Sequence, residues 1–256
     1  NNVRIEKASI QKYLGTKGLL ENVVDRAFNE ELFKVKDTMR SPYYNGLHLI
    51  NRKVLIEYLR QLLHGDQRIA PFDILALEDA VYTQIAFETA DNNVRKIRIG
   101  GIIDRLDRVT DPHTGMPTIR VVDYKTGVQA TRKIKEIEEI FSDANISQKH
   151  SDYYLQALLY SLIVDNSTKY NRQKDCVSPA LLFIKQASKE DYNPVLEIDS
   201  KKIDNVREYK EEFEKCLKEV LQEIFNTTLP FTPTSDNTRC EKCTYRRICR
   251  VNSVES

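Results

Sequence analysis

One strand, residues 118–127, constrains the fold of this chain more than any other segment. Side chains alternate between the two faces of a strand, so Asp123 and Lys125 lie on the same face as Ile119 and Val121. An acidic and a basic side chain therefore project next to each other from an otherwise apolar face, just before Gly127 ends the strand. The chain must contain a sheet that can hold this pair.

The chemistry of this pair allows two interpretations. Carboxylate oxygens are ligands suited to Mg²⁺ or Mn²⁺, and a lysine two residues away can orient water or stabilise charge on a phosphate. The alternative is a salt-bridged pair at a strand end. The Asp-x-Lys pattern by itself does not decide between the two.

The preceding strand, residues 100–107, adds a second acid. Asp104 stands in an apolar strand that a hairpin links to the strand of Asp123, so the two acids can meet across the ladder. Ionised carboxylates in such a place are costly unless they are paired or bound to metal. Asp107 lies three residues further on and hence on the other face, where we expect a surface partner of Arg105 or Arg108.

The rest of the chain alternates between helical and strand-like sequence patterns. Apolar residues recur with helical periodicity through the first 65 residues, and β-branched and aromatic residues fill strands between residues 72 and 129. We expect a helix over 152–164, strands over 179–184 and near 195–198, and a long helix over 202–225. This order predicts an α/β fold with a mixed central β-sheet flanked by helices.

Composition excludes several classes of protein. The 256 residues are 41% hydrophobic and 30% charged, enough for one large domain or one domain with a small addition. No apolar run approaches the roughly 20 residues that cross a bilayer, and the start lacks a signal peptide, so we expect a cytoplasmic protein without membrane contact. The net charge of +1 means that any contact with DNA must be local.

Two further motifs stand out. Gln156 and Tyr160 lie four residues apart, one above the other on the helix over 152–164, where they could reach one substrate or could mark an ordinary helix boundary. Cys240, Cys243 and Cys249 crowd near the C-terminus, a clustering that in a cytoplasmic protein suggests metal or iron–sulfur ligation.

In their order, the Asp104 strand, the Asp-x-Lys strand and the Gln156-x-x-x-Tyr160 helix resemble the PD-(D/E)xK nuclease superfamily, most closely the C-terminal nuclease domains of RecB and AddB. The resemblance implies a restriction-endonuclease-like core. It also implies that Asp104, Asp123 and the carbonyl of Tyr124 bind Mg²⁺ or Mn²⁺. Lys125 would assist the attacking water, while Gln156 and Tyr160 would contact DNA or support the site.

The resemblance also extends to an acidic residue earlier in the chain. Glu78 resembles the acidic residue that often precedes the Gly-x-x-Asp strand in these nucleases. It could equally be a solvated residue at a strand end, and Glu88 is a competing candidate.

The cysteine segment resembles the C-terminal part of an AddB-type iron–sulfur staple. A [4Fe–4S] cluster needs four ligands, and Cys240, Cys243 and Cys249 supply three. The fourth cysteine, which lies upstream in that family, has no counterpart before Asp104. His48 is no clear match for the family's metal-binding histidine, and we expect it to be exposed or packed on a helix. We therefore expect the chain to be a piece of a longer protein, in which Zn²⁺ or free thiols could replace the cluster.

These inferences divide the chain into three parts: an N-terminal helical cover (1–70), a nuclease core (71–226) and a cysteine-rich staple segment (227–256). The implied function is a metal-dependent DNA exonuclease in recombination and double-strand-break repair, working with a helicase. One alternative is a catalytically weak DNA-binding or structural module that supports a helicase. Another is a zinc-binding interaction domain, in which the acids are incidental.

Overall fold

A computed structural model gives the structure of residues 2–35, 43–111, 114–127, 133–142, 149–230, 232, 240–241 and 243–249. Its main sheet has five strands in the order β1-β2-β3-β4-β5, and two short strands pair separately. The strands are β1 (Val3–Ile5), β2 (Phe72–Glu88), β3 (Val94–Thr110), β4 (Pro117–Lys125), β5 (Cys176–Phe183), β6 (Glu197–Ile198) and β7 (Lys201–Lys202). Neighbours from β1 to β4 are antiparallel and β5 is parallel to β4, which confirms the predicted mixed sheet.

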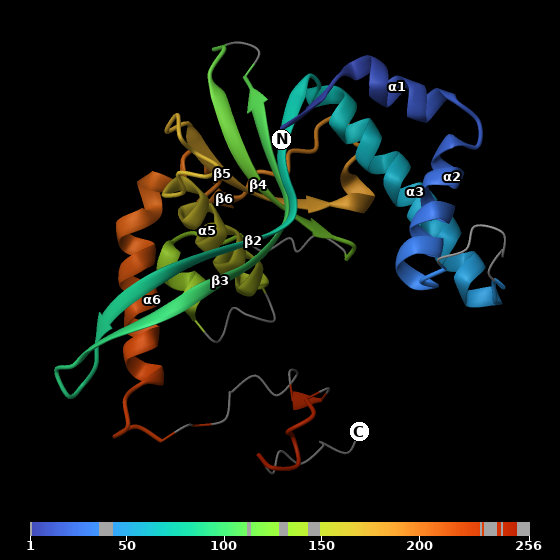
Figure 1. Cartoon of the computed structure of the whole chain (residues 1–256). Coiled ribbons are helices and arrows are strands. Elements are labelled where there is room, and N and C mark those ends of the chain that lie inside the picture. Colours follow the sequence, from blue (N-terminus) through green and yellow to red (C-terminus); the bar gives the residue numbers. More distant parts are fainter. Residues whose placement is uncertain are drawn as a thin grey trace.

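Helices lie between β1 and β2, cross over between β4 and β5, and follow the last strands (Figure 1). The α-helices are α1 (Lys7–Gly15), α2 (Leu19–Ala27), α3 (Gly46–Ile69), α5 (Ser151–Asp165) and α6 (Lys210–Ile224). A π-helical turn (Phe28–Leu32) and 3₁₀ turns (Ile137–Phe141, Ile184–Gln186, Val206–Tyr209) complete them. None of the helices in these ranges is long and apolar enough to span a bilayer.

The hairpin of β2 and β3 is much longer than the rest of the sheet. Its strands have 17 residues each and pair from Asp73 opposite Arg108 to Glu88 opposite Val94. Only the part of β3 from Arg105 onward pairs with β4. The remainder projects as a two-stranded arm, which runs to the lower left in Figure 1. The first of the strands predicted between residues 72 and 129 is thus a single continuous strand over Phe72–Glu88.

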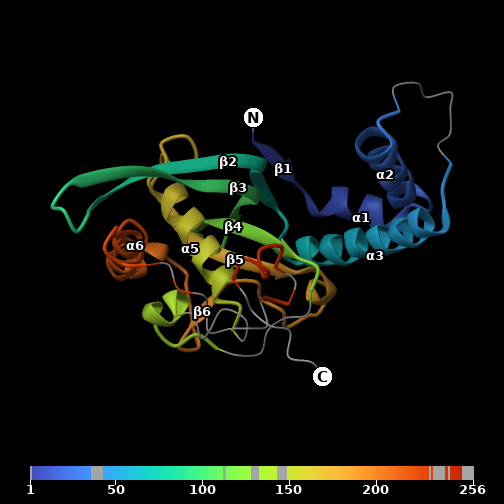
Figure 2. The same ribbon diagram turned by 90° about the horizontal axis from the view of Figure 1, so that it is seen from below.

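Helices α5 and α6 cover one face of the sheet (Figure 2). The main core lies between them and the strands, and its fully buried members include Leu106, Val121, Leu158 and Phe213. Ile119 belongs to the same core, which confirms the face predicted for it and Val121. The face that carries Asp123 and Lys125 is thus the face packed against α5.

The opposite face of β4 and β5 is covered by the C-terminal half of α3 and by the 3₁₀ turn that follows β5. Tyr58 and Leu62 of α3 pack against Val122 and Leu182. Close approach depends on Gly65, because a Cβ there would lie 2.8 Å from the carbonyl oxygen of Ala187. A side chain at this position would hold α3 away from the sheet.

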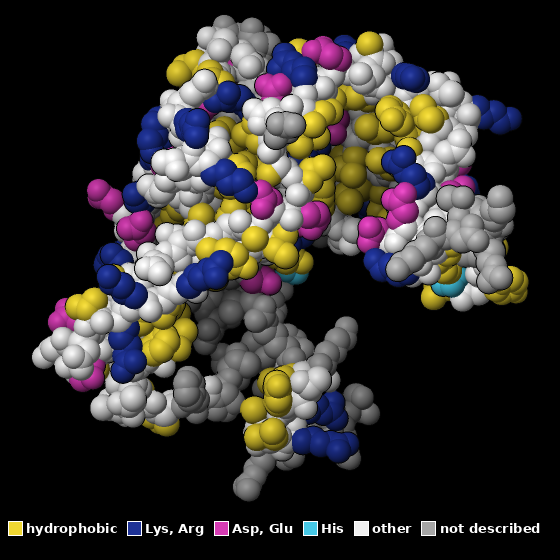
Figure 3. Space-filling model, viewed as in Figure 1, with side chains coloured by type: hydrophobic (Ala, Val, Ile, Leu, Met, Phe, Trp, Pro, Cys, Tyr) yellow, Lys and Arg dark blue, Asp and Glu magenta, His cyan; other side chains and the backbone are white. Residues whose placement is uncertain are grey.

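The other N-terminal helices do not cover the sheet. A separate cluster of Leu20, Val24, Phe28 and Ile56 joins α2, the π-helical turn and the first half of α3. These elements stand beside the sheet in Figure 2. In Figure 3, apolar side chains line the hollow between them and the strands. Among the described N-terminal helices, the second half of α3 is the part that packs on β4 and β5.

The last helix begins later than predicted. Lys201–Lys202 forms β7, a 3₁₀ turn follows, and α6 starts at Lys210. The side chain of Asn205 accepts a hydrogen bond from the backbone N–H of Arg207, which starts the 3₁₀ turn. An Asn that caps a helix start in this way stops helical periodicity from extending towards the N-terminus.

Candidate functional site

The register of β3 and β4 brings the two predicted acids together. Arg105 pairs with Val122, so the next position along both antiparallel strands sets Asp104 beside Asp123. Asp104 is half-buried and its Oδ2 accepts a hydrogen bond of 2.7 Å from the backbone N–H of Tyr124. The carboxylate of β3 is thereby fixed to the peptide unit that joins Asp123 to its neighbour on β4.

Asp123 is buried under α5. Its Oδ1 accepts a 3.0 Å hydrogen bond from Nε2 of Gln156, and its Oδ2 lies 2.6 Å from Nζ of Lys125. The ammonium group of Lys125 is therefore the partner of Oδ2. Burial raises the pKa of Asp123, Lys125 opposes the rise and the charge of Asp104 adds to it. Asp123 is thus paired with Lys125, and Asp104 adds a second negative charge beside the pair.

Lys125 also contacts an aromatic side chain of α5. Its Nζ lies 4.1 Å from the centre of the Tyr153 ring, within the range of a cation–π interaction. The Tyr153 ring in turn stacks on the imidazole of His150, with centroids 4.8 Å apart and an angle of 9° between the rings. Sequence analysis missed both residues, although the aromatic position three residues before Gln156 shares its face of the helix.

Tyr160 lies one turn after Gln156 and reaches β3. A Cβ on Gly101 would lie 1.9 Å from the Tyr160 hydroxyl oxygen, so only glycine leaves room for this ring. Burial raises the pKa of Tyr160, a hydrogen bond with Gln156 opposes the rise, and the charges of Asp123 and Asp104 add to it. The structure therefore gathers Asp104, Asp123, Lys125, Gln156 and Tyr160 at one place.

The two candidate glutamates lie in different places. Pairs on either side, Leu77 with Arg105 and Asp79 with Ile103, leave Glu78 opposite Asp104 on the neighbouring strand. Glu78 is exposed, with a left-handed φ of 48°, and forms no hydrogen bond or ion pair with another described residue. Glu88 lies ten residues further along β2, roughly 33 Å away at strand spacing, at the end of the arm.

Asp107 differs from its prediction. Alternation places it on the face opposite Asp123, as expected, but it is fully buried rather than a surface residue. Its carboxylate accepts hydrogen bonds of 2.8 Å from Arg105 and Arg120. Arg105 also donates to Asp66 of α3 at 2.9 Å, and Arg108 pairs instead with Asp175.

The cysteines and His48 lie outside this site. Cys240 and Cys243 are half-buried, Cys249 is exposed, and all three thiols are free. Within the described ranges, no three side chains of His, Cys, Asp or Glu are grouped to hold a metal. His48 stands in the first turn of α3, where it completes a capping box with Asn45 and packs edge-on against Phe33. It is a helix-packed histidine, as expected.

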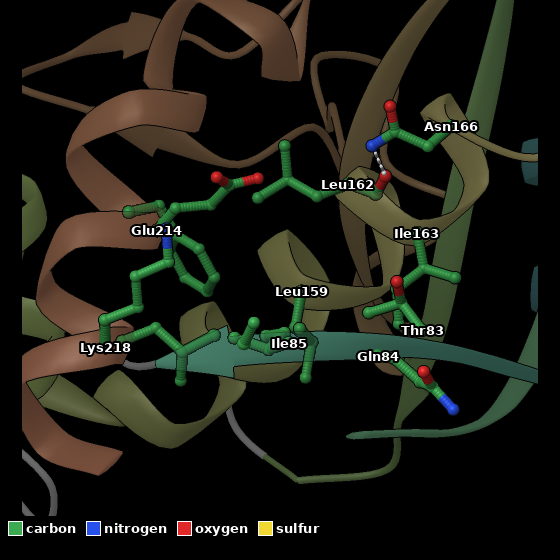
Figure 4. A pocket seen from close by; sticks show the side chains of 12 residues that line it. Thr83, Gln84, Ile85, Leu159, Leu162, Ile163, Asn166, Glu214 and Lys218 are labelled. Atoms are coloured by element: carbon green, nitrogen blue, oxygen red, sulfur yellow. Dashed lines mark hydrogen bonds between the residues drawn. The ribbon is translucent and has the colours of Figure 1, made fainter. Parts of the chain in front are cut away.

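A cavity of about 250 Å³ lies between β2, α5 and α6 (Figure 4). Its walls include Ile85, Leu159, Phe213 and Leu217, with Glu214 and Lys218 beside them. None of the gathered site residues lines it. The cavity is therefore a gap in the core of the α5 face rather than part of the site.

The comparisons with known proteins agree with this geometry at the level of the superfamily. The profile of the PD-(D/E)XK nuclease superfamily matches residues 8–250, which is almost the whole chain. No curated protein gave a significant match. The site residues lie on the central strands and on the helix that follows them, within the matched range. The chain thus belongs to the PD-(D/E)XK nuclease superfamily.

Proposed function

We propose that the chain is a metal-dependent deoxyribonuclease whose site consists of Asp104, Asp123 and Lys125. The observation that carries this proposal is the shared placement of the three side chains on the α5 face of β3 and β4. Hydrogen bonds from Tyr124 N–H and Gln156 hold the two carboxylates. A superfamily of nucleases supplies the reaction class.

The side chains fit a divalent cation. The buried carboxylate of Asp123 has a single lysine beside its Oδ2, and Asp104 places a second carboxylate next to it. Hard oxygen ligands of this kind suit Mg²⁺ or Mn²⁺, and we propose the carbonyl of Tyr124 as a third ligand. Such a cation lowers the pKa of bound water and neutralises charge on the phosphate.

The protein side chains have separate roles in this proposal. The ammonium group of Lys125 orients the attacking water and offsets charge that develops on the phosphate. Gln156 fixes the carboxylate of Asp123 through its 3.0 Å hydrogen bond. Tyr160 lies over Gly101 and closes the site on the side of β3. We include Glu78 as a further acid opposite Asp104 that could contact the site through water or metal.

The finer assignment is a RecB/AddB-type exonuclease in recombination and double-strand-break repair, with a helicase as partner. It rests on the resemblance of the three motifs, in their order along the chain. An exonuclease requires a DNA end, so linear DNA should be degraded while a closed circle of the same sequence stays intact. Cleavage of both would mean an endonuclease and would remove the exonuclease assignment.

An iron–sulfur role for Cys240, Cys243 and Cys249 has less support. The described thiols are not gathered as a metal site, so no step of the reaction is assigned to a cluster. We retain the proposal that they supply three ligands of a [4Fe–4S] cluster whose fourth ligand lies elsewhere. Iron and acid-labile sulfide in the purified protein would support it, whereas stoichiometric zinc would point to a zinc site.

The direct test is degradation of end-labelled linear DNA with Mg²⁺ or Mn²⁺. The parent chain should cleave, and Asp123→Ala and Lys125→Ala should not. Asp191→Ala is the matched control, because Asp191 is exposed and lies outside the site. Binding of DNA without metal-dependent cleavage would favour the alternative, a catalytically weak module that supports a helicase.

A further inference from the structure

Two stacked rings stand at the start of α5, next to the proposed reacting centre. His150 immediately precedes the helix, and its backbone carbonyl accepts a hydrogen bond of 3.0 Å from the N–H of Tyr153. The imidazole and the phenol ring are nearly parallel, with centroids 4.8 Å apart. Both side chains are half-buried rather than enclosed in the core. Part of this aromatic pair is therefore open to a ligand.

The aromatic pair is connected to the site by direct contacts. The Tyr153 ring lies 4.1 Å from Nζ of Lys125, which in turn lies 2.6 Å from the carboxylate of Asp123. Gln156, which bonds to Asp123, follows Tyr153 by three residues on the same face of α5. A phosphate held at Asp123 and Lys125 would thus have an aromatic surface within the reach of its own nucleotide.

We propose that His150 and Tyr153 form a stacking site for an unpaired nucleobase next to the phosphate that is cleaved. The proposal rests on the nuclease function proposed above and adds the substrate class, a single-stranded DNA segment. Aromatic side chains bind single strands by stacking on the faces of successive bases, largely without regard to sequence. Bases inside a duplex already stack on their neighbours, so this site favours strands that are single or frayed.

His150 combines a left-handed backbone with a half-buried imidazole ring. Its φ of 51° and ψ of 46° lie in a region where asparagine, aspartate and histidine are enriched, so asparagine can replace it without a change of backbone. Within the described part of the chain, the imidazole forms no hydrogen bond or ion pair with another residue, and its ring stacks on that of Tyr153. The imidazole nitrogens are therefore not committed to a structural partner among these residues.

Tyr153 has a second possible role, because it could serve only to position Lys125. Substitution of His150 separates the two roles, since the contact between Lys125 and Tyr153 remains. His150→Asn removes the ring and keeps the left-handed backbone, while His150→Phe restores a ring. His64→Asn is the matched control, because His64 is exposed on α3.

The experiment measures the binding of a single-stranded oligonucleotide that carries 2-aminopurine and of the same sequence as a hairpin duplex, without divalent metal. Loss of one stacked base should weaken single-strand binding by His150→Asn roughly 5- to 150-fold. Duplex binding should change less than about twofold. The parent and His150→Phe should quench 2-aminopurine fluorescence, and His150→Asn should not.

The outcomes separate this inference from the proposed function. If the parent cleaves DNA but His150→Asn binds single strands as the parent does, the stacking site is wrong and the nuclease stands. Equal loss for single strands and duplex would also reject it, because a general backbone contact would then explain the loss. A parent that neither binds nor cleaves DNA would overturn both.

Discussion

The two faces of the sheet at β3 and β4 carry the same kinds of charged residue with opposite results. On the α3 face, Asp107 accepts three hydrogen bonds from Arg105 and Arg120, and Arg105 also bonds to Asp66. On the α5 face, Asp123 pairs with Lys125 at 2.6 Å, while Asp104 accepts a hydrogen bond from the uncharged backbone N–H of Tyr124. One face balances two acids with two arginines, whereas the other leaves an acid in excess.

Burial does not distinguish the two faces. Asp107 is 0% exposed and Asp123 is 8% exposed, so both side chains are buried away from solvent. The pKa of Asp107 is nevertheless lowered, because Arg120 and Arg105 outweigh the cost of burial, whereas burial raises the pKa of Asp123. The difference lies in the partners. It supports a structural role for the acids of the α3 face and the cation site that we propose for the α5 face.

The largest expected effect comes from breaking the balanced face. Asp107→Asn leaves Arg105 and Arg120 buried without their shared carboxylate, which should lower the free energy of unfolding by about 3–5 kcal/mol. Urea denaturation followed by circular dichroism would measure it. The exposed control Asp191→Asn should change the free energy by less than about 0.5 kcal/mol. Equal values for the two variants would refute the structural role of Asp107.

On the α5 face we expect the reverse pattern. A raised pKa means that folding favours protonated Asp123, so its ionised form lowers stability as the pH rises through the carboxylate range. Asp123→Asn should therefore leave the free energy of unfolding at neutral pH unchanged or raise it. Metal-dependent cleavage should fall about 100- to 1,000-fold, because a group that stabilises the transition state is lost.

Denaturation and cleavage of Asp123→Asn and Asp107→Asn would be measured side by side. A strong loss of stability in Asp123→Asn would mean that this carboxylate is structural, like Asp107. The two faces would then no longer differ.

A smaller effect should follow from displacing Tyr160 without removing a charge. A methyl group in Gly101→Ala would meet the Tyr160 hydroxyl oxygen at 1.9 Å, so the ring must move away from the site. Because small misplacements in a site are costly, cleavage should fall about 10- to 100-fold. Gly46→Ala is the control, since nothing lies within 4 Å of a Cβ there. Unchanged cleavage by Gly101→Ala would show that Tyr160 has no part in the site.

Much of the site's arrangement follows from local sequence patterns. Alternation in β4 predicts that Asp123 and Lys125 share a face with Ile119 and Val121, because that pattern depends only on strand geometry. Spacing on α5 likewise predicts that Gln156 and Tyr160 align. Sequence alone could not predict the burial of Asp107. That burial depends on Asp66, 41 residues earlier on α3, and on Arg120 of the next strand.

Contacts between distant segments also decide other features that the sequence alone does not reveal. The first helices have the periodicity of a cover, and in the described structure the half of α3 that carries Gly65 packs on the sheet, whereas α2 packs on the first half of α3. The sequence of the strand likewise cannot show why a glycine stands at position 101. The ring that leaves no room for a side chain there belongs to Tyr160 of α5. Local pattern predicts which face a residue occupies, and tertiary contacts decide what that face meets.

Binding of Mn²⁺, measured by electron paramagnetic resonance without DNA, tests the charge difference between the faces most directly. The parent chain should bind Mn²⁺, and Asp104→Asn and Asp123→Asn should each lose that binding, while the exposed control Asp191→Asn should keep it. If the parent binds no Mn²⁺, or if both site variants bind it as the parent does, the excess acid on the α5 face is not a cation site and the account fails.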